Sequence, residues 1–408
     1  MPSVLAQLVA DPDKFLARPP TEATVWHQPA EPLTAVLSLE SVDTLVAEGS
    51  LRAAMLSVVL GGQRQPATAY TWGQRPTQPG FADVVRPAEL TVLLDRGATL
   101  VLESLHRTWP PVGHLCRQLS REIGMPVQAN AYLTPAGAQG FAHHHDTHSV
   151  LIVQTVGSKT WQVSPPIVTD PLEHQPFRAS MVTDEHRRRF AEPVLEVVLR
   201  RGDVLWVPRG WIHNGFATDE ASLHLSLSLP PITPYWVATE LVRGLDVDER
   251  FRRDLPWGFG QDPQLRREVV AEVVDLLAEA LADLDRTEAA DRLAQRWRRY
   301  FLEPQRRPVE TVLGAPVGPD TAVRSVPEAV CGTDRLPDGR LRLHLADTAV
   351  VLDPPTVDPV TVRLVDADRT WTARDLDLPE TVAVELVRGL LRAGVVRREP
   401  HAPASIRA

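Results

Sequence analysis

A short histidine-rich segment carries residue types that bind metal ions. His143–His148 contains four histidines and one aspartate within the sequence AHHHDTHSV. On a β-strand, residues two positions apart share a face. His144 and Asp146 are therefore expected to point one way, and His143 and His145 the other way. Each pair predicts a different metal site.

The first interpretation uses His143-x-His145, a pair found in small barrel proteins of the cupin type. That pattern normally adds a glutamate three or four residues after the second histidine. The nearby residues here are Ser149 and Val150, which cannot ligate a metal as a carboxylate would. This interpretation therefore lacks its third protein ligand.

The second interpretation combines His144-x-Asp146 with the distant His213. Two imidazoles and one carboxylate on one face of an iron leave three positions open, as in non-haem Fe(II) oxygenases. Two open positions can chelate a 2-oxo acid, and the third can bind O2. The segment Gly202–His213 suits this role, because Pro208-x-Gly210 ends one strand and His213 begins the next. Such a turn can present a ligand inward at the mouth of a barrel.

Lysine is scarce in this chain, and one lysine stands close to the histidine segment. Only Lys14 and Lys159 are lysines among the 43 basic residues, a bias typical of a GC-rich genome. Lys159 follows Asp146 by 13 residues, so we expect it on the next antiparallel strand, pointing into the barrel. A buried lysine is costly unless it meets an anion, and the distal carboxylate of 2-oxoglutarate is such an anion. Asn130 and Tyr132, on the preceding strand, can add neutral hydrogen bonds on the same inner face.

Short strands are expected to position these residues. Between residues 127 and 230, β-branched and apolar runs recur between turn residues, as in VQANAYLTP, SVLIVQTVG and ASLHLSLSLP. This spacing predicts a sandwich or barrel. Before it, residues 42–48 and 112–123 are predicted helices, with Ser41 as the N-cap of the first.

The pattern after the strands is helical. A helix is predicted over 262–284, where Asp262 is a cap, proline follows in the first turn and apolar residues recur at helical spacing. A second helix is predicted over 289–301. The sequence 303–330 is rich in Pro, Gly and Val and is interpreted as a linker. A strand pair around 337–339 and a helix ending at Gly394 follow.

At the metal and lysine positions the sequence resembles the ribosomal oxygenases, a branch of the jumonji-C family. Members of that family are Fe(II)- and 2-oxoglutarate-dependent protein hydroxylases built on a double-stranded β-helix. Residues 130–161 resemble the branch nearly position by position, and Pro208-x-Gly210-x-x-His213 matches its third ligand. The resemblance implies that iron is bound by His144, Asp146 and His213, and the co-substrate by Lys159, Asn130, Tyr132 and Ser228. Ser228 stands where the family often has threonine.

The resemblance also implies an architecture for the whole chain. The fold class is α+β, with a mainly β, cupin-like catalytic core over residues 1–235. A helical dimerisation region follows over 236–302, then a linker over 303–330 and a winged-helix-like domain over 331–408. The implied assembly is a homodimer.

Three positions beside the predicted substrate opening depart from the family pattern. The family often has Pro, Tyr and Asp where this chain has His143, His145 and Thr147. His148 is also unusual. We interpret these histidines as rim or substrate-cleft residues rather than a second metal site, and we expect the substrate to differ accordingly.

Composition limits partners and location. The formal net charge of −9 disfavours a polyanionic partner, and the last predicted helix lacks a dense basic face. No nucleic acid is needed, and a basic ribosomal protein or peptide would suit an acidic chain. Two distant cysteines indicate a reducing compartment. There is no signal-peptide pattern and no apolar run of membrane-spanning length, so a cytoplasmic location without membrane association is expected.

The sequence therefore predicts an Fe(II)- and 2-oxoglutarate-dependent dioxygenase that uses O2 to hydroxylate a side chain of a protein or peptide. A second interpretation within enzymes is hydroxylation of a biosynthetic peptide or small metabolite, which the unusual rim histidines favour. A third is a non-catalytic metal-binding cupin module.

Overall fold

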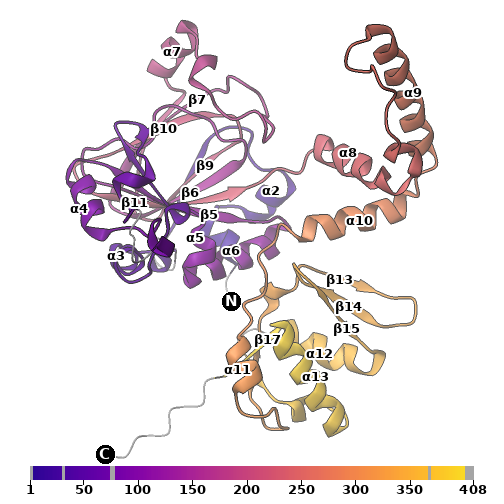
Figure 1. The fold of residues 1–408 in the computed structure, drawn as a ribbon. Coiled ribbons are helices and arrows are strands. Elements are labelled where there is room, and N and C mark those ends of the chain that lie inside the picture. Colours follow the sequence, from indigo (N-terminus) through magenta and orange to yellow (C-terminus); the bar gives the residue numbers. More distant parts are fainter. Residues whose placement is uncertain (1–2, 30–32, 74–78, 366–368, 400–408) are drawn as a thin grey trace, which may run out of the picture. The chain divides into compact units, whose positions relative to one another are not determined.

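The chain folds into two compact units. The computed structural model describes residues 3–29, 33–73, 79–365 and 369–399 (Figure 1). One unit comprises residues 1–230 and 301–408, and the other comprises residues 231–300. None of the described helices has the length and apolar character needed to cross a bilayer.

The region predicted to be the cupin-like core is built on two antiparallel sheets. The larger has the order β1-β9-β6-β11-β5-β4-β2-β3, and the smaller has the order β10-β7-β8. The strands are β1 (Thr24–His27), β2 (Leu56–Leu60), β3 (Gln63–Arg64), β4 (Thr99–Leu102), β5 (Gln128–Thr134), β6 (Ser149–Val156), β7 (Ser158–Ser164), β8 (Leu195–Arg200), β9 (Asp203–Val207), β10 (Ile212–Ala217) and β11 (Ser222–Leu229). The barrel or sandwich predicted over 127–230 is confirmed as paired antiparallel sheets.

Strand β6 is apolar on both faces, and the packing explains why. Leu151 and Val153 join the core under the helices, whereas Val150 and Ile152 join the cluster shared with the smaller sheet. A strand buried on both faces has no polar alternation. Its sequence therefore reads as one continuous apolar run.

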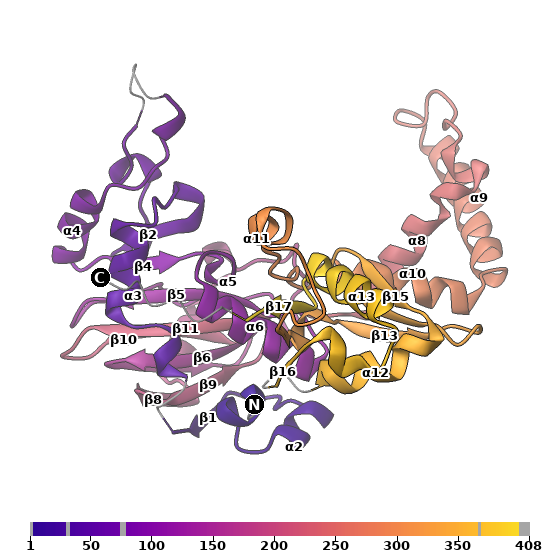
Figure 2. The same cartoon turned by 90° about the horizontal axis from the view of Figure 1, so that it is seen from below.

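Helices cover the outer face of the larger sheet. Both Figure 1 and Figure 2 show α5 and α6 beside β5. The helices of this region are α1 (Val4–Leu8), α2 (Pro12–Ala17), α3 (Leu39–Ala47), α4 (Pro87–Asp95), α5 (Leu105–Thr108), α6 (Pro110–Ile123) and α7 (Asp184–Ala191). Helix α6 matches the prediction over 112–123. Helix α3 starts earlier than predicted: Ser38 is its N-cap, and Ser41 is the third residue of a capping box.

The unit of residues 231–300 is entirely helical where it is regular. It contains α8 (Pro234–Arg243), the 3-10 turns η6 (Gly244–Val247) and η7 (Glu249–Arg252), α9 (Pro263–Ala282) and α10 (Arg286–Arg298). Asp262 caps α9, and Pro263 occupies its first turn, as predicted. The helix expected over 289–301 begins three residues earlier, because Asp285 provides its cap.

The C-terminal region has two three-stranded sheets. Their orders are β16-β12-β17 and β13-β14-β15. The elements are α11 (Pro308–Leu313), β12 (Val323–Ser325), the 3-10 turn η8 (Pro327–Ala329), β13 (Gly332–Arg335), β14 (Leu341–His344), β15 (Ala349–Leu352), α12 (Pro354–Val365), β16 (Thr370–Trp371), the 3-10 turn η9 (Ala373–Leu376), α13 (Glu380–Ala393) and β17 (Val396–Arg398). Residues 366–368 and 400–408 of the expected 331–408 domain lie outside the described residues.

The expected linker is structured. Residues 303–330 contain α11, β12 and η8, and β12 is the central strand of its sheet. Elements this short show no hydrophobic period, so sequence patterning missed them. The strand pair around 337–339 is confirmed, as is the helix that ends at Gly394.

Candidate active site

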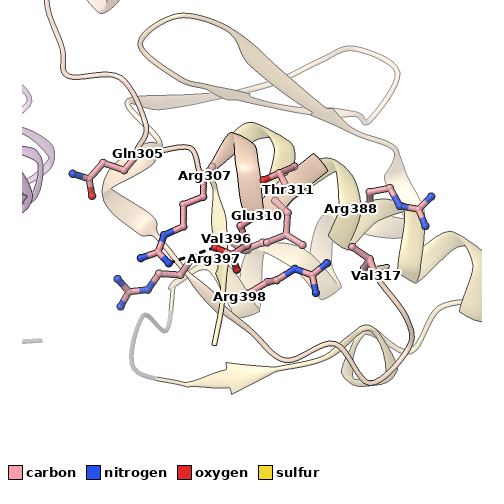
Figure 3. A pocket seen from close by; sticks show the side chains of 11 residues that line it. Gln305, Arg307, Glu310, Thr311, Val317, Arg388, Val396, Arg397 and Arg398 are labelled. Carbon is pink, nitrogen blue, oxygen red and sulfur yellow. Dashed lines mark hydrogen bonds and ion pairs between the residues drawn. The ribbon is translucent and has the colours of Figure 1, made fainter. Parts of the chain in front are cut away.

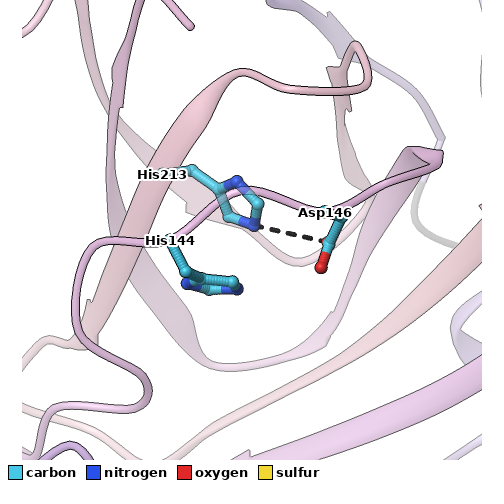
Figure 4. A group of neighbouring side chains, drawn as sticks. All are labelled: His144, Asp146 and His213. Atoms are coloured by element: carbon cyan, nitrogen blue, oxygen red, sulfur yellow. Dashed lines mark ion pairs between the residues drawn. The ribbon is translucent and has the colours of Figure 1, made fainter. Parts of the chain in front are cut away.

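The structure brings three distant side chains together at one end of the strands. One ligand atom of each of His144, Asp146 and His213 lies within 4.8 Å of the others. Figure 4 shows these side chains turned toward one another. The Nε2 atom of His213 lies 3.7 Å from Oδ2 of Asp146. Among the described residues, this is the only group of His, Cys, Asp and Glu close enough to hold a metal ion.

Backbone pairing fixes the two histidines next to each other. His144 and His213 form an antiparallel bridge: the His144 N–H donates to the His213 carbonyl at 3.1 Å, and the reverse bond is 2.9 Å. The amide of Gly210 also donates to the Asp146 carbonyl at 3.0 Å. The segment that carries His144 and Asp146 is therefore pinned by backbone bonds to the segment that carries His213.

Further hydrogen bonds leave the Nε2 atoms available. Nδ1 of His144 lies 2.8 Å from the Ala142 carbonyl, and Nδ1 of His213 lies 3.1 Å from the Trp211 carbonyl. A carbonyl can only accept, so we assign a proton to each Nδ1. Each Nε2 then carries a lone pair, as a metal-binding imidazole requires.

The protonation states suit a divalent metal. Burial, followed by the neighbouring His144, lowers the pKa of His213 to about 4, so its ring is neutral at pH 7. Burial raises the pKa of Asp146, but His213 and His144 outweigh burial and hold that pKa below its ordinary value. The group thus offers two imidazole nitrogens and one anionic oxygen, the donor set that suits non-haem Fe(II).

The other histidine pair points elsewhere. The ring of His143 stacks on Phe190 with centroids 5.0 Å apart, and His145 packs edge-on against Phe177 at 5.5 Å. Neither joins the metal-binding group, and neither does His148. The structure therefore favours the His144, Asp146 and His213 combination over the His143-x-His145 pair.

Lys159 lies in the same pocket as the three candidate ligands. It is 2 % exposed, and its Nζ donates to Thr134 Oγ1 at 3.1 Å. Burial alone lowers its pKa from 10.5 to about 7. Within the described part of the chain it has no ion pair with an acidic side chain. A buried ammonium without a counter-ion is strongly disfavoured, so this position calls for an anionic ligand.

Gly215 lets Lys159 and Trp161 pack closely against strand β10. A Cβ on Gly215 would lie 2.9 Å from Cε of Lys159 and 3.1 Å from Cε3 of Trp161. Any larger residue at this position would push the lysine or the indole out of place. The absence of a side chain here lets the stem of Lys159 and the indole of Trp161 pack directly against β10, which holds the ammonium in the pocket.

Only two of the four residues expected to contact the co-substrate line the pocket. Lys159 and Tyr132 line the pocket. Asn130 does not; its Oδ1 accepts from the Ser104 amide at 2.8 Å. Ser228 also lies outside the lining, whereas Ser226, one position nearer on the same strand face, is part of it. Ser226 is therefore the serine of β11 that lines the pocket, and the contact of Ser228 with the co-substrate stays a prediction.

Two lining residues were missed by sequence reasoning. His224 is 1 % exposed, stacks on Tyr132 at 4.8 Å, and has no hydrogen-bond partner for Nδ1 among the described residues. Trp161 lies edge-on to it at 5.2 Å. His224 and Ser226 are two residues apart on one strand and therefore share a face, and this pattern could have indicated that His224 lines the pocket.

Comparisons with known proteins agree with this geometry. Residues 105–235 match the family model of the JmjC domain. The chain is 32 % identical to rat (Rattus norvegicus) ribosomal oxygenase 1 over 269 residues, which is 61 % of this chain and 43 % of that protein. It is 29 % identical to the Drosophila simulans bifunctional lysine-specific demethylase and histidyl-hydroxylase NO66 over 319 residues, 69 % of this chain and 37 % of that one. The chain thus spans less than half the length of these curated relatives.

A solved structure extends the likeness in fold. The ribosomal oxygenase YcfD from Escherichia coli, in complex with cobalt and succinic acid, has a TM-score of 0.52 and 14 % identity. The alignment covers 97 % of this chain and 99 % of that one. At this identity the likeness shows the fold alone.

Fold and site together define a JmjC-domain protein with a cupin-like, α+β architecture. Within that class, the chain is similar in sequence to the ribosomal oxygenases that the comparisons name, and similar in fold to one of them.

Proposed function

We propose that this protein is an Fe(II)- and 2-oxoglutarate-dependent dioxygenase that hydroxylates an amino-acid side chain of a protein or peptide. One observation carries the proposal: a two-histidine, one-carboxylate group shares a pocket with a buried lysine that has no acidic partner among the described residues. The first group suits iron, and the second suits the distal carboxylate of a 2-oxo diacid.

Each residue then has a defined task. Iron is held by Nε2 of His144, Nε2 of His213 and a carboxylate oxygen of Asp146. Lys159, itself oriented by Thr134, neutralises the far carboxylate of 2-oxoglutarate. When bound, iron, 2-oxoglutarate and O2 supply the oxidising power that converts an unactivated C–H bond to C–OH. The protein contributes position and exclusion of water.

The neutral contacts of the co-substrate are assigned to the residues that line the pocket. Tyr132 keeps its phenol protonated, because burial raises its pKa, and it can donate a hydrogen bond. Ser226 is assigned the same role. Asn130 supports the site indirectly by lying against Tyr132, whose pKa its hydrogen bond lowers.

A protein substrate is supported by the relatives. They are named ribosomal oxygenases, and one is named a lysine-specific demethylase and histidyl-hydroxylase. The acidic chain suits a basic ribosomal protein. The alternative of a biosynthetic peptide or small metabolite rests on the unusual histidines of this segment, His143, His145 and His148.

The other regions receive roles by the same reasoning. We assign residues 236–302 to homodimerisation, supported by apolar side chains that α9 leaves exposed, including Val270, Val274 and Leu281. We assign the segment 331–399 to a winged-helix-like domain, supported by its small sheets and by α12 and α13. A reducing, cytoplasmic location agrees with two cysteines that form no disulfide.

The test is turnover of 2-oxoglutarate to succinate with Fe(II), ascorbate and either ribosomal proteins or synthetic peptides. Wild-type protein should form succinate and add one oxygen to a substrate, detected by intact mass. His144→Ala should abolish both. His27→Ala is the matched control, because that histidine is exposed and does not line the pocket. Equal turnover in His144→Ala would refute the metal site, and absent 2-oxoglutarate binding in wild type would favour the non-catalytic module.

A further inference from the structure

A second pocket lies along one edge of the C-terminal sheet, within the same unit as the catalytic region but lined by none of its residues. Val396, Arg397 and Arg398 all line it. Consecutive residues of a strand point to opposite faces, so a cavity that touches all three must lie against the strand edge. Its other walls come from α11, α13 and the residues that flank these two helices: Gln305, Arg307, Glu310, Thr311, Val317, Arg388, Leu391 and Gly394.

Among the described residues, the edge of β17 that faces this pocket has backbone groups without a backbone hydrogen bond. In the order β16-β12-β17, β17 is an outer strand. On its inner side, Val395 accepts from Val326, and the amide of Glu399 donates to Ala322. Hydrogen-bonded residues alternate along an antiparallel pair, so Val396 and Arg398 direct their N–H and C=O groups outward. An outer strand of this kind can pair with an added strand.

The pocket is strongly basic in an acidic chain. Four of its lining residues are arginines and one is a glutamate, whereas the whole chain has a net charge of −9. Figure 3 shows these arginines around the pocket, with Glu310 paired to Arg307. Arg398 donates to the Ala315 carbonyl, and Arg397 has no ion pair within the described residues. Guanidinium groups recognise carboxylates with paired hydrogen bonds.

The floor of the pocket is apolar. Val396 and Leu391 are buried, and Val317 is half-buried. An inorganic anion would gain no favourable contact from this apolar surface. A strand that adds to β17 would place alternate side chains on it, and the remaining side chains among the arginines.

We propose that this pocket binds an extended, acidic peptide segment of a partner protein by strand addition to β17. The backbone of the peptide pairs with Val396 and Arg398, its carboxylates meet Arg307 and Arg397, and an apolar side chain rests on Leu391. The site is independent of the catalytic pocket and of the reaction proposed above. Binding at this site would bring the protein to a partner without changing the reaction that it catalyses.

The experiment measures fluorescence anisotropy of a labelled hexapeptide of alternating glutamate and valine, titrated with the full chain. Saturable binding that weakens with added salt is expected. The double variant Arg307→Gln/Arg397→Gln should weaken binding about tenfold, because two partly exposed charge-assisted hydrogen bonds are lost. Arg335→Gln is the matched control: this exposed arginine of β13 lies outside the pocket and should leave binding unchanged.

Peptide chemistry separates strand addition from simple charge attraction. Methylating alternate backbone amides of the hexapeptide removes the donors on one edge, so one of the two possible methylation patterns should abolish binding. Equal binding of both methylated peptides would overturn strand addition. A second hexapeptide, in which lysine replaces every glutamate, tests the charge preference. Absent binding of the glutamate–valine peptide, or equal binding of this lysine–valine peptide, would overturn the acidic specificity. Tighter binding of an RNA oligomer, with the same dependence on Arg307 and Arg397, would reassign the pocket to phosphate.

Discussion

Replacing Lys159 by methionine should make the protein more stable while removing 2-oxoglutarate binding. The folded-state pKa of Lys159 is about 7, whereas its ordinary value is 10.5. The unfolded chain therefore binds this proton more tightly than the folded chain between about pH 7 and 10.5. That difference lowers folding stability by about 4 kcal/mol at pH 7 and about 2 kcal/mol at pH 9.

Methionine fills a similar volume without a charge. It forfeits the hydrogen bond to Thr134 Oγ1, a loss of about 1 kcal/mol. The net gain for Lys159→Met should be about 3 kcal/mol at pH 7 and about 1 kcal/mol at pH 9. Urea unfolding at both pH values measures it. The control is Lys14→Met, since Lys14 is the other lysine of the chain and is exposed. Its stability should not change.

The affinity for 2-oxoglutarate should fall as the pH rises, because it depends on the same proton of Lys159. The protonated lysine binds the carboxylate, and above its folded pKa it is increasingly neutral. The protonated fraction falls from about one half at pH 7 to about one in a hundred at pH 9, so wild-type affinity should fall about fiftyfold. Calorimetric titration with 2-oxoglutarate and Mn(II) in place of iron would show this. A Lys159→Met protein that is no more stable than wild type at pH 7, or that binds 2-oxoglutarate as well, would refute the reasoning.

Three further substitutions test other parts of the site. Loss of an outer-shell partner lowers metal affinity by roughly 10- to 100-fold. Asp146→Asn removes a direct ligand, so it should lower metal affinity by more than this, as measured by Co(II) titration. Gly215→Ala should raise the Michaelis constant for 2-oxoglutarate and lower stability by about 1–3 kcal/mol, because the new methyl lies 2.9 Å from Cε of Lys159; an unchanged constant would contradict the assigned binding position. Gly157→Ala should destabilise the protein by about 3 kcal/mol or more, because its φ is +63° and a Cβ would lie 1.9 Å from the Ala221 carbonyl oxygen; an unchanged unfolding midpoint would contradict the turn geometry.

The chemical content of the site was predictable from residue types and spacing. His144-x-Asp146 shares strand parity, and the distant His213 follows a turn that ends a strand. Lys159 stood out because lysine is scarce and because its position places it on the strand next to the histidine segment. None of these inferences needed coordinates, since strand periodicity is a local property of the backbone.

The neighbours of Lys159 were less predictable. Strand alternation predicts that Ser226 and Ser228 share one face of β11. It does not predict which of the two serines lies beside Lys159. Pairing of β11 with its neighbours β5 and β6 decides this. The pairing with β5 puts His224 opposite Tyr132, inside the pocket, and the register against β6 shifts between Leu223 and His224. Register is set by contacts between strands, which one strand's sequence does not contain.

The short elements of residues 303–330 were missed for a similar reason. A strand of three residues, such as β12, has no period to detect. It is a strand because β16 and β17 lie on either side of it and satisfy its backbone groups. Helices α9 and α13 were predictable because caps and apolar spacing mark them locally.

By itself, the sequence determined which side chains could bind a metal, an anion and a 2-oxo acid, and which strand face each would occupy. It left two histidine pairs as candidates. The tertiary structure decided between them, because the antiparallel bridge between His144 and His213 places their rings side by side with Asp146. That choice depends on two segments meeting across the fold, and only packing and backbone pairing bring them together.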